Sequence, residues 1–280
     1  MTFEKTLALG AIAGFTIFLG LPLARMRGAG ARVRLASTML ATGILAFLFM
    51  EIAGKAGEQV EETMLAAHQG AGSWARFVGL AIMLAVGFVV GLVSLGWFEG
   101  RWLRRTPPMA GGSEAASISA VSLPAIRAAV DPMRMGLLIA AAIGLHNFSE
   151  GLAIGVAAQT GAVSLATVLI VGFALHNATE GFGIVGALDA EARPSWGWLG
   201  LAGLIGGGPT VIGTAIGWRV DSQPLALAFL ALAAGAILYV VLELWRGARR
   251  RANPVLATSA LAGGFLIAFF SELVIAYAGF

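Results

Sequence analysis

The sequence has no cysteine in its 280 residues, and charged side chains make up only 12% of it. The lack of cysteine excludes disulfides and thiolate metal ligands. A glycine-rich phosphate loop followed by Lys-Ser/Thr is also missing, which argues against an ATP-driven pump. Apolar residues are abundant instead: 58% of the chain is hydrophobic and its mean hydropathy is +0.86. This composition indicates an integral membrane protein rather than a soluble domain.

Long apolar runs support that assignment. Residues 6–24 and 77–98 carry no charge, and each run is long enough to cross about 30 Å of hydrocarbon as a helix. The alternating pattern of barrel strands is missing, so we predict an all-α integral membrane protein with one transmembrane domain over 1–280. The eight expected helices cover residues 6–24, 35–54, 77–98, 135–158, 163–188, 196–218, 225–245 and 255–278.

The basic residues predict how the helices cross the membrane. If the N-terminus lies outside, 14 of the 18 Arg and Lys residues fall in cytoplasmic loops, and only Lys5, Lys55, Arg76 and Arg219 lie outside. This asymmetry favours an even number of spans with both termini outside the cytoplasm. Residues 101–134, rich in Pro, Gly and Ser, are then a cytoplasmic loop. Basic loops of this kind also explain the isoelectric point near 9.9 without nucleic-acid binding.

Two parts of the chain resemble each other. The stretch "LATGILAFLFMEI" (40–52) aligns with "LAAGAILYVVLEL" (232–244), which places Glu51 on Glu243 at an offset of 192 residues. The first and sixth helices align weakly at an offset of 193. With the predicted topology, helices 1–3 and 6–8 run in opposite senses. We therefore predict an inverted repeat that flanks the helix 4–5 pair, an arrangement common in transporters.

A short polar motif occurs twice within apolar runs. "LHNFSEG" stands at 145–151 and "LHNATEG" at 175–181. In each motif the His and Glu are four residues apart, and the Asn and Glu are three apart, so all three share one helix face. The short connection between helices 4 and 5 makes them antiparallel neighbours. The two polar faces are therefore expected to meet near mid-membrane.

The six motif residues form a predicted metal site, namely His146, Asn147, Glu150, His176, Asn177 and Glu180. A lone carboxylate at that depth costs roughly 2.5–3.5 kcal/mol, which a divalent cation offsets. Imidazole and carboxylate ligands suit Zn²⁺, Fe²⁺, Mn²⁺, Co²⁺ or Ni²⁺. The alternative is that these polar residues hold the helices together. Glu51 and Glu243 are candidate entry and exit residues, or else interfacial acids at helix ends. The third histidine, His68, is expected in an acidic outer loop.

These features together resemble the ZIP family of divalent metal transporters, with the bacterial, GufA-like branch the most similar. The resemblance implies zinc uptake into the cytoplasm across a bacterial inner membrane, with Cd²⁺ a further candidate ion. His146, Glu150, His176 and Glu180 would form one site. The two asparagines and the same two glutamates would form a second.

The sequence also departs from the family pattern. Ser149 and Thr179 stand where the family commonly has proline before the Glu. Gly208 precedes Pro209 where many bacterial members have a Glu that contributes to the second site. The second metal is therefore expected to be weak or absent.

Two other functions remain open from the sequence. An intramembrane hydrolase could use the same His and Glu residues around metal-bound water, although no His-Glu-x-x-His motif occurs. A metal-stabilised structural or receptor protein would bind metal without moving it. The expected partners are divalent metal ions and the lipid bilayer, with a homodimer as one candidate assembly.

Overall fold

The computed structural model describes residues 1–25, 30–103, 131–186, 188, 193–248 and 253–277. Over these residues the chain is all-helical, and eight helices are long and apolar enough to cross a membrane. The long helices are α1 (Phe3–Phe15), α2 (Ala31–His68), α3 (Trp74–Phe98), α5 (Pro132–Gln159), α6 (Val163–Gly186), α7 (Trp196–Gly217), α8 (Gln223–Ala248) and α9 (Pro254–Tyr277). Most of the predicted 101–134 loop lies outside the described residues.

Local sequence explains where several helices begin and end. The Asp131 carboxylate accepts a hydrogen bond from the Met133 backbone N–H at 3.0 Å, and Pro132 occupies the first helical position of α5. Ser195 caps α7 in the same way. After α1 the chain continues through two 3₁₀ turns, Thr16–Leu19 and Leu21–Arg25, and α3 ends in a π-helical turn at Glu99–Leu103.

α2 is much longer than the sequence predicts. Its 38 residues span about 57 Å, whereas the predicted helix ended at residue 54. The stretch that was expected as an acidic loop is helical as far as His68, which is its exposed last residue. The prediction failed because hydropathy marks only the lipid-embedded part of a helix, and the polar continuation contains no Pro.

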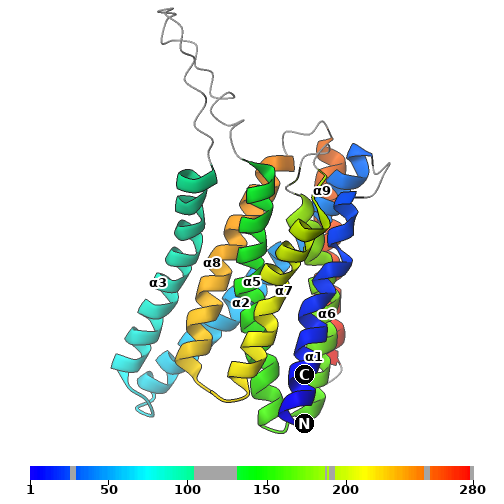
Figure 1. The fold of residues 1–280 in the computed structure, drawn as a ribbon. Helices are drawn as coiled ribbons and strands as arrows, with labels where there is room; N and C mark the ends of the chain where they lie inside the picture. Colours follow the sequence, from blue (N-terminus) through cyan, green and yellow to red (C-terminus); the bar gives the residue numbers. More distant parts are fainter. Residues whose placement is uncertain (26–29, 104–130, 187, 189–192, 249–252, 278–280) are drawn as a thin grey trace, which may run out of the picture.

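The helix directions follow the predicted inverted arrangement. α1 and α7 run in opposite directions, as do α2 and α8, and α3 and α9 (Figure 1). α1 begins and α9 ends at the same end of the bundle. α3 packs along α8 as α9 packs along α2, and α5 packs along α7 as α6 packs along α1 and the turn that follows it.

Close helix contacts show that the repeat holds at the level of single residues. A Cβ on Gly91 of α3 would meet the backbone carbonyl of Leu232 on α8, and a Cβ on Gly264 of α9 would meet that of Leu40 on α2. Leu40 and Leu232 are 192 positions apart, the offset seen in the sequence. Side chains at both glycines would force the backbones apart, so the two interfaces require glycine for the same reason.

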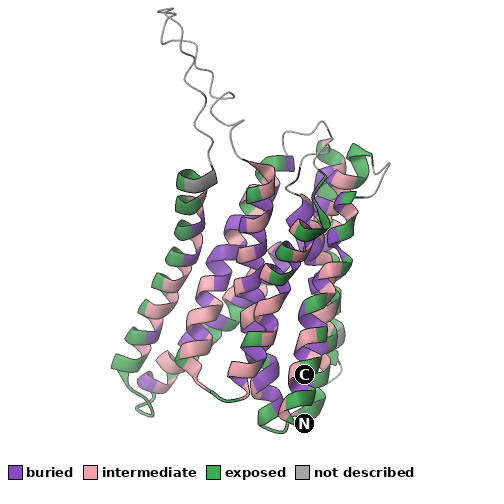
Figure 2. Cartoon of the chain, in the orientation of Figure 1, coloured by how far each residue is buried: buried purple, intermediate pink, exposed green. Residues whose placement is uncertain are grey.

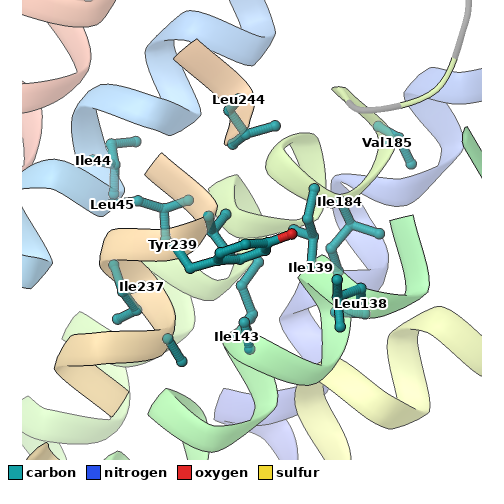
Figure 3. Close-up of a cluster of buried hydrophobic side chains, with 14 of the residues drawn as sticks. Ile44, Leu45, Leu138, Ile139, Ile143, Ile184, Val185, Ile237, Tyr239 and Leu244 are labelled. Atoms are coloured by element: carbon teal, nitrogen blue, oxygen red, sulfur yellow. The ribbon is translucent and has the colours of Figure 1, made fainter. Parts of the chain in front are cut away.

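The core lies between the central helices. Buried residues gather on the facing sides of these helices, while α3 exposes residues along its outer side (Figure 2). The exposed positions of α3 include valines such as Val86 and Val93, which suit contact with lipid. Figure 3 shows part of the core, a cluster of buried side chains that includes Tyr239 of α8 and the aliphatic residues Ile44, Ile139 and Ile184.

Candidate metal centre

The two motifs lie on adjacent antiparallel helices, as their spacing predicts. α5 and α6 are joined by the short turn at 160–162, and they pack against each other. His146 and Glu150 lie one turn apart on α5, and His176 and Glu180 lie one turn apart on α6. His146, Glu150 and Glu180 are almost completely buried, whereas the His176 side chain keeps 20% of its surface exposed.

Glu150 joins the two imidazoles. Its Oε1 lies 3.0 Å from Nε2 of His146 and is also paired with Nε2 of His176. The ligand atoms of these three residues all lie within 4.8 Å of one another. Glu180 is close as well, with Oε1 at 3.8 Å from Nε2 of His146. One ion placed among these atoms could therefore be reached by two nitrogens and by carboxylate oxygen.

The two asparagines occupy equivalent positions in the repeat. Nδ2 of Asn147 donates to the Gly206 carbonyl on α7 at 3.0 Å, and Nδ2 of Asn177 donates to the Ala13 carbonyl on α1 at 3.1 Å. Ala13 and Gly206 are 193 positions apart, which is the offset between the first and sixth helices. Only Asn147 also donates to a carboxylate, Oε2 of Glu180 at 3.2 Å.

Several buried oxygens at this place have no hydrogen-bond partner among the described residues. They are Oδ1 of Asn147, Oδ1 of Asn177, Oε2 of Glu150 and Oε1 of Glu180. A buried polar atom without a partner costs about 1–3 kcal/mol. All four are acceptors, and the ring nitrogens of His146 and the Thr210 hydroxyl are also without a hydrogen-bond partner there. A divalent ion satisfies such a set, and the residues present fit Zn²⁺ or a similar transition metal.

The residues that replace the family prolines have a clear structural role. The Ser149 hydroxyl donates to the His146 carbonyl at 2.6 Å, and the Thr179 hydroxyl donates to the His176 carbonyl at 2.7 Å. A proline three residues after each histidine could not make this bond. Both helices run without interruption through the motifs. At the other departure, a Cβ on Gly208 would meet open space.

A cavity of about 180 Å³ adjoins the centre. His146, Glu150 and His176 line it, and so do Glu51 and Lys55 of α2 and Glu272 of α9. The candidate entry residue Glu51 therefore shares a cavity with residues of both motifs. Lys55 was not expected there from the sequence, which gave it only as an outer loop charge. The sequence does contain one signal for this position of Lys55. Lys55 lies four residues after Glu51, a spacing at which the two side chains can pair on one helix face.

The candidate exit residue Glu243 is placed differently. It lies near the end of α8, where its Oε2 pairs with Arg246 at 2.5 Å, and it does not line this cavity. Glu51 likewise pairs with a basic residue of its own helix, Lys55. The two acids matched by the repeat therefore both form an ion pair with a basic residue of their own helix. Of these two acids, Glu51 lines the cavity beside the motifs and Glu243 does not.

A comparison with protein-family models identifies a family for this chain. The model described as ZIP Zinc transporter covers residues 113–276, which is more than half of the chain. The chain belongs to the ZIP zinc transporter family. Both motifs and helices α5 to α8 lie within the matched region. A search of curated proteins found no match. Membership of this family supports divalent metal transport and a transporter rather than an enzyme.

Proposed function

We propose that this ZIP family member takes up a divalent transition metal, Zn²⁺ above all, through the centre between α5 and α6. The observation that carries the proposal is the position of Glu150 between two histidines. The neighbouring buried oxygens have no hydrogen-bond partner among the described residues. Those atoms bind the ion as transported substrate. The remaining transition metals named from the sequence, and Cd²⁺, compete for the same ligands.

The charge pattern of the loops supports the proposed direction of transport. The charge pattern supports a bacterial inner membrane protein with both termini outside, as in the GufA-like branch, and the cavity beside Glu51 then faces the outer side. Alternating access requires one helix group to move against the other around the centre. One ion per chain is expected, because Gly208 supplies no carboxylate to a second position. A homodimer remains the candidate assembly.

The test is flux of ⁶⁵Zn²⁺ into proteoliposomes. The wild type should show saturable flux, while His176→Ala and Glu180→Ala should reduce it to background because each removes a ligand from a buried site. His68→Ala is the matched control, since this third histidine lies exposed at the end of α2. Tight Zn²⁺ binding without flux in the wild type would contradict zinc transport. Substrate turnover without flux would favour the hydrolase alternative.

A further inference from the structure

Lys55 stands where two cavities meet. The first is the cavity that contains the metal-binding motifs. The second is lined by Glu58, Glu62 and Asp221, and we call it the acidic vestibule. Lys55 lines both, together with Ser149, Ala153 and Leu230. A cation that travels from the vestibule to the centre therefore passes the Lys55 ammonium.

The vestibule favours cations. Its ionisable groups are the three acids and Lys55, and all three acids are exposed. Clefts lined by one sign of charge concentrate ions of the opposite sign. Glu58 and Glu62 belong to the part of α2 that extends beyond the predicted membrane helix. The unexpected length of α2 thus places acids in front of the metal-binding cavity.

The ammonium is paired with the first carboxylate of the inner cavity. Nζ of Lys55 binds Oε1 of Glu51, one helical turn away. The Lys55 side chain is 52% exposed and that of Glu51 is 18% exposed. Partly exposed ion pairs of this kind are weak, so the pair can exchange. When the ammonium leaves, Glu58 lies three residues away on the same helix as its next partner.

We propose that Lys55 is a tethered competitor for the entering metal ion. Its ammonium neutralises Glu51 until a divalent ion takes that carboxylate, and the ammonium then turns toward the acidic vestibule. The proposal rests on the proposed function, since it describes how the transported ion reaches the same centre. It makes Lys55 a determinant of apparent affinity rather than a metal ligand.

The experiment measures the KM for ⁶⁵Zn²⁺ flux in proteoliposomes. Lys55→Met keeps the aliphatic stem but removes the competing charge, so KM should fall about threefold, as expected for a weak ion pair. Lys55→Arg keeps the charge and should keep the wild-type KM. Lys5→Met is the matched control, because it removes the only other lysine of the chain. A loss of structure would lower flux instead of lowering KM.

A second comparison separates competition at Glu51 from a general effect of charge. In a Glu51→Gln background, Lys55→Met should leave KM unchanged, because the contested carboxylate has gone. If Lys55→Met lowers KM equally in both backgrounds, the ammonium acts through space and the proposal is overturned. An unchanged or raised KM for Lys55→Met beside normal wild-type flux also overturns it. Absence of wild-type flux would overturn the proposed function, and this inference with it.

Discussion

At the scale of single residues, the centre combines one bridging carboxylate with buried oxygens that find no hydrogen-bond donor in the described part of the chain. Glu150 contacts both histidines, whereas Glu180 is close to only one of them. The asparagines anchor the motifs to α1 and α7 through backbone carbonyls. The two halves of the site are therefore alike in their anchoring but differ in their contacts with the carboxylates.

That difference predicts unequal effects of two equivalent substitutions. Asn147→Ala removes the hydrogen bond to Glu180 as well as the anchor to α7, so the dissociation constant for Zn²⁺ should rise about 10–100-fold. Asn177→Ala removes the anchor to α1 and an amide oxygen but no hydrogen bond to a carboxylate, so it should have a smaller effect. Calorimetric titration of the purified proteins in detergent measures the dissociation constant of each variant and also gives the number of bound ions. Equal effects, or two tight ions in the wild type, would contradict the assigned arrangement.

At the scale of helices, close packing depends on glycine at defined positions. Gly264 of α9 lies against the backbone of α2, while its neighbour Gly263 has open space around its missing side chain. α9 is attached to the bundle mainly through this contact with α2. The two adjacent glycines therefore differ in what a methyl group would meet.

Adjacent substitutions should change stability in opposite directions. Gly263→Ala gains helix propensity worth up to about 1 kcal/mol at no steric cost, so the thermal midpoint in detergent should stay or rise. Gly264→Ala forces the α2 and α9 backbones apart and should lower stability by about 1–3 kcal/mol. Thermal unfolding followed by circular dichroism compares them. If the thermal midpoint of Gly264→Ala were equal to or higher than that of Gly263→Ala, the α2–α9 interface would accommodate a methyl group without cost, contrary to this prediction.

At the scale of the whole molecule, an inverted repeat surrounds the α5–α6 pair, and the cavity opens the centre toward the acidic extension of α2. From the side of the α2 extension inward, the order is the acidic vestibule, then the Lys55–Glu51 pair, then the candidate metal centre. The function proposed above requires this side to face outward. Membrane orientation is therefore the property of the whole molecule that most needs a direct test.

The natural absence of cysteine makes that test simple. Single cysteines can be placed at Ala71, in the exposed turn between α2 and α3, and at Arg193, exposed before α7. The turn between α2 and α3 and the start of α7 lie at opposite ends of the bundle (Figure 1). In intact cells a membrane-impermeant maleimide should label Ala71→Cys and should reach Arg193→Cys only after permeabilisation. The reverse pattern would invert the predicted topology and contradict the proposed outward-facing cavity.

The sequence by itself determined the helical class, the eight apolar spans, the repeat and the two motifs, because hydropathy and helical spacing are local properties of the chain. His146, Glu150 and His176 could be predicted to meet, since a short turn forces α5 and α6 to be antiparallel neighbours. Only the tertiary structure decided that Glu150 bridges the histidines and that the asparagines bond to Gly206 and Ala13. It also extended α2 and placed Lys55 at the metal-binding cavity. The bridge, the asparagine hydrogen bonds and the cavity depend on contacts between distant segments, which no single helix predicts. The extension of α2 was missed for a local reason, because hydropathy marks only the lipid-embedded part of a helix.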